Sequence, residues 1–222
     1  MGQLTSRQEI LQTEVSDPEM RNWLYASMAI RETSQVLAKY VHTQISQMHK
    51  NMRRAIGASG PCKQNCSHKD EKNNVWCTSC DRWRKEILCV CNPQYKINWT
   101  RLNSSQWHAN PYEVARAFIP RAHRLYYKSA EFHEDFRFSL SFIENCLLCS
   151  APPLLCQKAR QCQGRVKRKN LRMRMRDEDL QVTISVLTQL LALPELGQTE
   201  PVVHKLQLLQ DLPDTSDGCK IM

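Results

Sequence analysis

The sequence has little glycine and no apolar run long enough to cross a membrane. Only 6 of its 222 residues are glycine and 10 are proline, which excludes collagen-like and low-complexity chains. No stretch approaches the roughly 18 consecutive apolar residues that a spanning helix needs. The first twenty residues also lack the apolar centre of a secretory signal. We therefore expect a globular protein of the cytosol.

The short motifs that mark common active sites are also absent. The sequence contains no glycine-rich phosphate loop, no serine nucleophile elbow and no pair of histidines at zinc-binding helical spacing. The 7 histidines are scattered along the chain. Because no pattern selects a nucleophile or a base, we expect a non-enzymatic protein that acts by binding.

Helical periodicity accounts for most of the apolar residues. One stripe starts after Asp17, which can cap a helix that has Pro18 at its first position, and runs to about Arg54. That length exceeds the usual range for a globular helix, so we expect a break near Thr33 and Ser34. Further helices are expected over residues 110–118 and 132–149, from Asp177 or Asp179 to Pro194, and over 202–209.

These elements predict a mainly α fold, a helical bundle with a small insert that is rich in cysteine and tryptophan. We expect one helical domain over residues 17–196, with the insert at 61–109 and a basic segment at 157–176. A polar arm at 1–16 precedes the domain, and a helix and tail at 197–222 follow it.

The insert carries two close cysteine pairs. Cys62 and Cys66 are separated by three residues, Cys77 and Cys80 by two, and ten residues lie between the pairs. A reducing compartment argues against disulfides, and two such pairs supply the tetrahedral thiolate set of structural zinc. We therefore predict a structural Zn²⁺ bound by these four cysteines, with no open position for a substrate.

Other residues give weaker metal signals. His68 can replace one of the four thiolates, and Cys89 and Cys91 lie just downstream, where they can compete as ligands. Cys146 and Cys149 form a further close pair. We expect this pair inside an apolar helix, where buried packing or reversible acylation competes with metal binding.

Both ends of the chain carry lipidation patterns. The start, Met1-Gly2-Gln3-Leu4-Thr5-Ser6, fits N-myristoylation at Gly2, and the end, Cys219-Lys220-Ile221-Met222, fits farnesylation at Cys219. Lys220 departs from the farnesylation pattern at its least selective position. Stable anchoring takes two signals. We therefore expect two lipids, or one lipid and the basic segment, to hold the protein on the cytosolic face of a membrane.

The positive charge is concentrated in one segment. The formal net charge is +9, and nine Lys and Arg residues between 158 and 176 have no acidic residue among them. The other 22 basic residues balance the 22 acidic ones. The segment ends in a stretch, 171–176, that is expected to be extended, with arginines on one face.

Four interpretations of the basic segment stay open: nucleic-acid phosphate binding, contact with anionic lipid headgroups, a nuclear import signal, and a solvated loop. Because no aromatic residue is interleaved, base stacking is not expected there. The residues expected to contact RNA or lipid headgroups are Arg165, Lys167, Arg168, Lys169, Arg172, Arg174 and Arg176.

The segment Cys77–Leu88 resembles an uncharacterised vertebrate family typified by a human X-chromosome open-reading-frame protein. The likeness continues through Trp99, Trp107 and Glu113–Arg121. It extends more weakly to Asn22-Trp23, Ser141–Cys146 and Pro194–Leu196. The resemblance thus spans residues 20–196 and leaves the lipidation patterns outside it.

The resemblance implies a bundle similar to HEPN-type domains, some of which are RNases with an Arg-x4-6-His motif. The family's version of that motif falls here on 163–168, where Gln163 and Arg168 replace the arginine and the histidine. The resemblance therefore implies an inactive bundle with a binding role, with innate antiviral RNA binding as the first expectation. A membrane-tethered signalling adaptor is the second. An RNase is the third, since Arg101 and His108 meet the spacing loosely.

Overall fold

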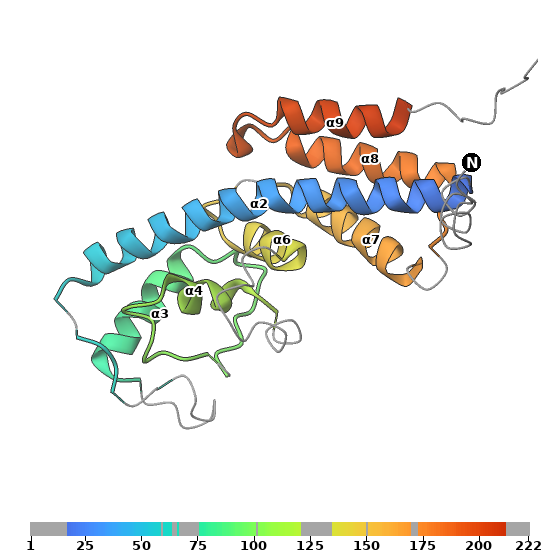
Figure 1. Cartoon of the computed structure of the whole chain (residues 1–222). Coiled ribbons are helices and arrows are strands. Elements are labelled where there is room, and N and C mark those ends of the chain that lie inside the picture. Colours follow the sequence, from blue (N-terminus) through green and yellow to red (C-terminus); the bar gives the residue numbers. More distant parts are fainter. Residues whose placement is uncertain are drawn as a thin grey trace, which may run out of the picture. The chain divides into compact units, whose positions relative to one another are not determined.

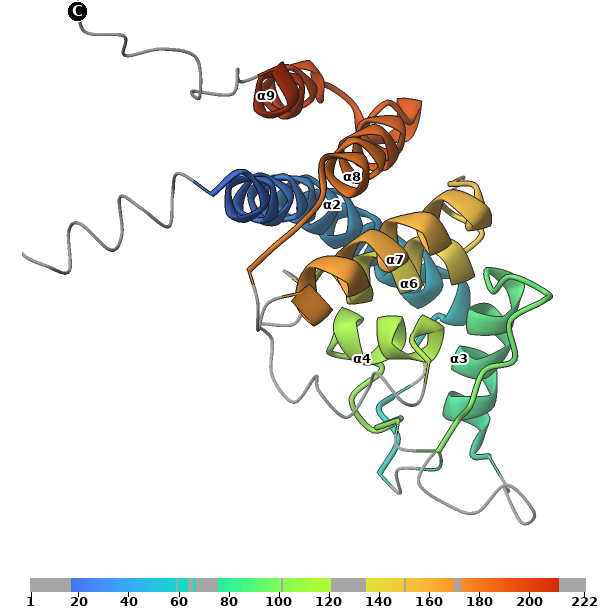
Figure 2. The same cartoon turned by 90° about the vertical axis from the view of Figure 1, so that its right-hand side faces the viewer.

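The structure is a computed structural model that describes residues 17–58, 60–63, 66, 76–100, 102–120, 135–149, 151–169 and 173–211. The chain forms two compact units. One contains the chain up to Thr33 together with Gln157 onward, and the other contains Ser34–Cys156. Figures 1 and 2 show the helices of both units in two views. The described residues are mainly helical, as predicted, and their only β-structure is an isolated bridge between Cys91 and Cys146.

The first helix, α2 (Pro18–Ile56), begins and ends at the signals seen in the sequence. The Asp17 carboxylate accepts a hydrogen bond of 2.9 Å from the Glu19 backbone N–H, as an N-cap does. At the other end Gly57 has φ +71°, and its N–H donates to the Arg53 carbonyl at 3.2 Å. A glycine in the left-handed region satisfies a free carbonyl at a helix end and stops the helix.

The break expected near Thr33 and Ser34 does not occur, and α2 continues through both residues. Thr33 is buried and its hydroxyl donates to the Ala29 carbonyl at 2.8 Å. This bond within the helix satisfies the hydroxyl and lets the apolar stripe continue from Ile30 to Leu37, both of which are buried. The border between the two compact units nevertheless falls between Thr33 and Ser34.

The first unit contains the start of α2 and four later elements. These are the part of α7 (Pro153–Lys169) from Gln157 onward, α8 (Asp177–Leu191), the 3₁₀ turn η4 (Pro194–Leu196) and α9 (Glu200–Asp211). Helix α9, which the sequence predicted over 202–209, packs beside α8 in both views (Figures 1 and 2).

Helix α7 was missed at the sequence level, although it covers most of the basic segment. Its buried side includes Cys156, Ala159, Cys162 and Val166, which recur at helical spacing. Because these side chains are small or contain sulfur, the apolar side of the helix is only weakly hydrophobic, and the pattern is hard to recognise among the surrounding charged residues. Trp23 fixes the helix to α2, since its indole N–H donates to the Val166 carbonyl at 3.2 Å.

Helix α8 does not begin with the expected aspartate cap. Its N-cap residue is Arg176, whose side chain makes no capping hydrogen bond, and Asp177 and Asp179 lie in the first turn. Both carboxylates have tertiary partners instead. Asp177 accepts from the Asn22 side-chain amide, and Asp179 pairs with Arg165 at 3.6 Å.

The second unit contains the rest of α2 and a core of aromatic residues. Its other elements are α3 (Thr78–Cys89), α4 (Pro111–Ala115), the 3₁₀ turn η2 (Arg116–Phe118) and α6 (Phe136–Asn145). The largest fully buried side chains of the core include Trp83, Trp107, Phe118, Phe138 and Phe142. Phe118 and Phe142 meet edge to face, with ring centroids 5.5 Å apart.

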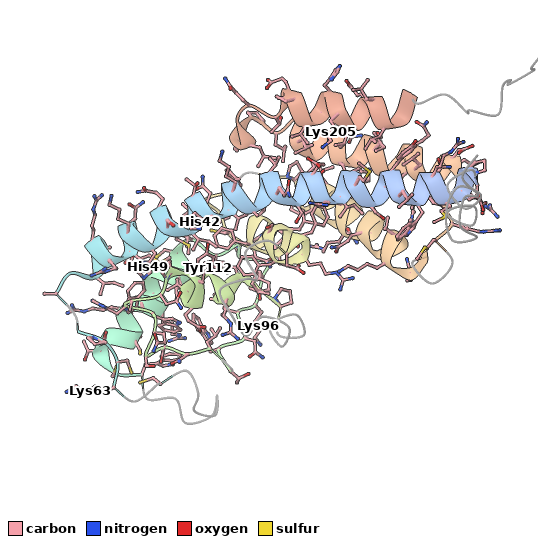
Figure 3. All side chains as sticks on the ribbon, viewed as in Figure 1. His42, His49, Lys63, Lys96, Tyr112 and Lys205 are labelled. Atoms are coloured by element: carbon pink, nitrogen blue, oxygen red, sulfur yellow. The ribbon has the colours of Figure 1, made fainter. Side chains whose placement is uncertain are left out.

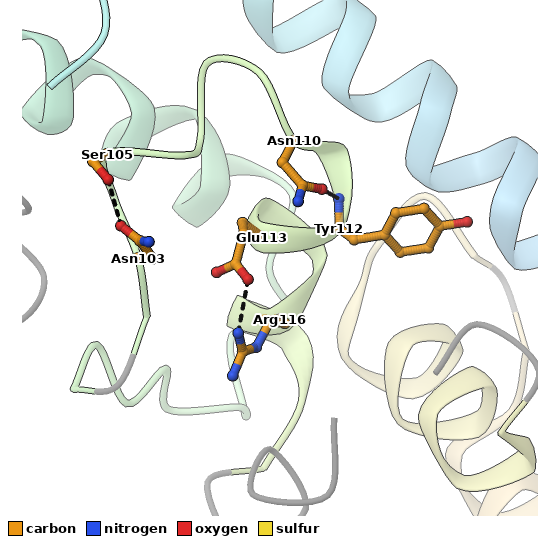
Figure 4. A network of polar contacts seen from close by, with 6 residues as sticks. All are labelled: Asn103, Ser105, Asn110, Tyr112, Glu113 and Arg116. Atoms are coloured by element: carbon orange, nitrogen blue, oxygen red, sulfur yellow. Dashed lines mark hydrogen bonds and ion pairs between the residues drawn. The ribbon is translucent and has the colours of Figure 1, made fainter. Parts of the chain in front are cut away.

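The helix expected at 110–118 forms as α4 followed by η2. The Asn110 side chain caps it by accepting from the Tyr112 N–H at 2.9 Å, with Pro111 at the first position (Figure 4). Glu113 and Arg116 then form an ion pair of 2.7 Å, with side chains 14% and 18% exposed. The pair ties the end of α4 to η2.

Helix α6 ends four residues earlier than expected, so Cys146 and Cys149 lie outside it. Hydrogen bonds to a distant part of the chain explain this early end. The Asn145 carbonyl accepts from the Asn92 N–H at 2.9 Å, and the Leu147 N–H donates to Val90 at 2.8 Å. These bonds to the chain after α3 replace the helical pattern beyond Asn145.

Candidate metal centre

The four cysteines predicted as zinc ligands come together in the second unit. The sulfurs of Cys62, Cys66, Cys77 and Cys80 all lie within 4.8 Å of one another, and the first two are 3.6 Å apart. A tetrahedral zinc with bonds of about 2.3 Å to sulfur places its ligands about 3.8 Å apart. The spacing therefore fits one Zn²⁺, and it is too wide for a disulfide, whose sulfurs are about 2 Å apart.

Local structure explains how the second pair is presented. Cys77 is the N-cap of α3, and its sulfur accepts from the Cys80 N–H at 3.5 Å. The cap turn points both sulfurs to one side of the helix start. The Cys66 sulfur accepts from the Cys77 N–H, also at 3.5 Å. Backbone N–H groups aimed at sulfur stabilise the thiolate form that binds a metal.

The first pair is held against α3 from the side of α2. The Ser79 hydroxyl donates to the Gly60 carbonyl at 2.7 Å. The Arg82 guanidinium donates to the Ile56 carbonyl at 3.3 Å. These two contacts fasten the start of α3 to the chain that leaves α2, which is where the first cysteine pair lies.

Without a metal the cluster favours thiols over thiolates. Burial raises the pKa of Cys66, and it also raises the pKa of Cys80. Several negative charges cannot share so small a buried space without a cation. Zinc binding therefore releases protons, and the zinc affinity rises with pH.

The weaker metal candidates stay outside the cluster. Cys89 is exposed, while Cys91 is buried and its thiol donates to the Asn92 and Tyr95 carbonyls at 3.6 and 3.7 Å. Burial raises the pKa of Cys91 to about 11. Neither cysteine competes for the four-cysteine site in this structure. His68 lies outside the described residues.

The pair Cys146 and Cys149 is buried, with 1% and 7% of each residue exposed. The hydrogen bond between the two thiols, followed by burial, raises the pKa of Cys146. Protonated, buried thiols pack like small apolar side chains. The structure therefore favours packing over acylation for this pair.

The basic segment is split between a helix and an irregular stretch. Lys167 and Arg168 are exposed near the end of α7, and Arg176 is exposed before α8. Met175 is buried and Met173 exposed, so the predicted alternation holds only in part. Arg174 pairs with Asp17 at 3.3 Å, and Arg165 pairs with Asp179. The Lys169 side chain, Arg172 and the lipidation sites Gly2 and Cys219 lie outside the described part of the chain.

The structure also brings together a group of tryptophans beside the metal centre, which no sequence motif predicted. Trp76 stacks on Trp107 with centroids 5.9 Å apart, and Trp99 meets the edge of both rings at 5.6 and 6.0 Å. The signal available in the sequence was the presence of four tryptophans within the insert, one of them directly before Cys77.

Comparison with known proteins places the chain in a family. No solved structure matches it. A mouse (Mus musculus) protein named "Uncharacterized protein CXorf38 homolog" is 27% identical over 109 residues, which is 46% of this chain and 34% of that protein. The aligned part thus spans about a third of the relative's length. A family model described as "Domain of unknown function (DUF4559)" matches residues 14–216. Because this match covers most of the sequence, the chain belongs to that family.

Proposed function

We propose that the protein is a zinc-stabilised, non-enzymatic binding protein. In this proposal the basic segment contacts RNA phosphates, and lipids on Gly2 and Cys219 hold the protein on the cytosolic face of a membrane. The observation that carries the proposal is the cluster of four sulfurs within 4.8 Å of one another. Four sulfur ligands fill the coordination shell of zinc and leave no position for a substrate, so the metal acts on the fold.

Three exposed cations support phosphate contact by the basic segment: Lys167, Arg168 and Arg176. The ion pair of Arg174 does not oppose this role. The Arg174 side chain is 63% exposed, and so open an ion pair contributes little to stability. It can therefore exchange its carboxylate for a phosphate, to which arginine binds with two parallel hydrogen bonds.

The test of RNA binding is a double variant, Lys167→Gln with Arg168→Gln. The variant is expected to weaken binding of a short single-stranded RNA and to flatten its salt dependence by about one unit of slope for each residue. Titrations at several salt concentrations measure both quantities. The matched control is Arg53→Gln with Arg54→Gln, which removes two exposed arginines from the last turn of α2. Equal losses in both variants would contradict a specific role for the segment.

The test of the anchor is Cys219→Ser in eukaryotic cells. The variant is expected to leave the membrane fraction for the cytosol, because a single remaining acyl chain gives only marginal membrane binding. Intact-mass spectrometry of the wild type reports both lipids directly. Cys89→Ser, which removes an exposed cysteine outside the lipidation pattern, is the control. An unmodified wild-type mass would contradict the lipid anchor, and an unchanged distribution of Cys219→Ser would contradict a role for farnesylation in holding the protein at the membrane.

The finer parts of the proposal are a HEPN-like bundle and an innate antiviral role. The helical content supports the bundle, and both parts rest otherwise on the resemblance. The same exposed cations equally suit anionic lipid headgroups, which a membrane-tethered adaptor would contact. The basic sequence at 167–169 also suits a nuclear import signal. Liposome binding without RNA binding selects the adaptor. RNA cleavage that is lost on changing His108 selects the RNase.

A further inference from the structure

A cavity of about 720 Å³ opens in the second unit beside the metal centre. Its walls include three aromatic side chains, Trp76, Tyr95 and Trp99, and two cations, Arg84 and Lys96. Lys96 is labelled in Figure 3. The volume falls within the range of about 300–1,000 Å³ that is usual for small-molecule sites. The cavity therefore has the size and the mixed lining of a binding site.

The aromatic wall is held in place from behind. Trp107 is fully buried, and it stacks on Trp76 and meets the edge of Trp99 at 6.0 Å. Trp76 and Trp99 are only half-buried. Because the buried ring fixes both partners, the two indoles that line the cavity are already in position before any ligand arrives.

The charge in the cavity has one sign. The Arg84 guanidinium lies 5.8 Å from the ring centroids of both Trp76 and Trp99. Its Nε is buried and has no hydrogen-bond partner. Lys96 is exposed at the rim, and none of the described residues that line the cavity is acidic. The cavity therefore repels a cation, although its aromatic side chains resemble a cage for one. An anion that can reach Arg84 gains a charge-assisted bond.

The metal centre sets the position of this wall. Trp76 immediately precedes the ligand Cys77, and Arg84 follows the ligand Cys80 by one helical turn on α3. Leu88 lines the cavity one turn further along α3, on the same face as Arg84. Zinc at the start of α3 therefore fixes one side of the cavity.

We propose that this cavity binds a nucleotide. The base stacks on the exposed indole surface, and the phosphate is bound by Arg84 and Lys96. Flat rings stack on any nucleobase, and arginine and lysine supply the two kinds of phosphate contact. Two sources share this chemistry: a free nucleoside monophosphate, and the terminal nucleotide of a single-stranded RNA. The inference goes beyond the proposed function, because the cavity and the basic segment share no residue.

The experiment titrates the full chain with AMP, with UMP, and with a short RNA carrying or lacking a terminal phosphate. Calorimetry measures the affinity, and the indole N–H signals of Trp76 and Trp99 in NMR spectra report the site. Arg84→Gln is expected to weaken binding roughly tenfold to hundredfold, the range for hydrogen bonds to charged groups. Trp99→Ala is expected to weaken it roughly fivefold to hundredfold, the range for loss of base stacking.

Arg84 is partly buried, so a second variant tests the same cavity without touching the core. Lys96→Gln is expected to weaken AMP binding several-fold. Its matched control is Lys85→Gln, which removes an exposed cation of α3 that pairs with Asp81 and does not line the cavity. Binding of AMP and UMP with these losses supports a free nucleotide as ligand. Binding of the phosphorylated RNA alone, with the same losses, supports a strand end.

Three results would overturn the proposal: no saturable binding of any of these probes, unchanged binding by both Arg84→Gln and Lys96→Gln, or an equal loss in Lys85→Gln. The double variant at Lys167 and Arg168 separates this site from the proposed function. It is expected to bind AMP normally, so failure of the cavity and failure of the basic segment give different results.

Discussion

Replacing Cys80 with serine is expected to abolish stoichiometric zinc binding and to lower the melting temperature of the protein. Cys80 is 1% exposed and belongs to the four-sulfur cluster. Mutating a residue that only hydrogen-bonds to a metal ligand typically lowers metal affinity about 10- to 100-fold. Loss of a ligand itself is therefore expected to weaken zinc binding by at least that much, and the binding energy of a structural zinc is folding energy. Metal analysis and thermal melts measure the two effects.

The control for Cys80→Ser is Cys89→Ser, because both positions lie on α3 and Cys89 is exposed away from the cluster. The control is expected to retain one zinc per chain and the wild-type melting temperature. Cys77→Ser, which removes the capping sulfur, is expected to behave like Cys80→Ser. A wild-type protein without zinc, or a Cys80→Ser protein that still holds one equivalent, would contradict the metal centre.

The candidate metal site could be predicted because its information is local. Cys77 and Cys80 share one turn, and the spacing of Cys62 and Cys66 is equally short, so pattern alone was enough to group the four sulfurs. The helix cap at Asp17 and the stop at Gly57 are local signals of the same kind.

Features set by distant contacts were not predictable. The Asn145 carbonyl ends α6 by accepting from Asn92, 53 positions away in the sequence, and no local signal marks that point. The carboxylate of Asp177, which was expected to cap α8, instead accepts a hydrogen bond from the side-chain amide of Asn22. For Asp177 the tertiary partner competes with a capping preference that is worth only about 1 kcal/mol.

The residues of the aromatic cavity could not be grouped from the sequence either, because distant contacts bring them together. Trp76, Arg84 and Trp99 look unrelated in the sequence, yet they meet around one space. The basic segment contains no aromatic residue, so its sequence predicts no stacking site for a base. The fold supplies aromatic and basic groups together at a different place, because α3 and the chain after Cys91 both border the cavity.

Replacing Trp107 with alanine is expected to lower the free energy of unfolding by about 3–5 kcal/mol, the usual cost of removing a large buried aromatic side chain. Trp107 is fully buried and stacks on Trp76. Its carbonyl accepts a hydrogen bond of 2.8 Å from the His49 ring, which itself stacks on Trp83 at 5.3 Å. The missing indole leaves a void beneath the cavity wall. Urea denaturation followed by circular dichroism measures the loss.

Trp99→Ala is the matched comparison, because Trp99 belongs to the same aromatic group and is only half-buried. Its cost in stability is expected to be smaller than that of Trp107→Ala, since it removes less buried surface. Trp99→Ala is nevertheless expected to weaken nucleotide binding at least as much as Trp107→Ala does, because it removes a stacking surface directly. Equal destabilisation by the two variants would contradict the assignment of Trp107 to the core and Trp99 to the cavity wall. A Trp99→Ala protein that keeps both wild-type stability and wild-type AMP affinity would contradict the role of Trp99 as a stacking surface in the binding site.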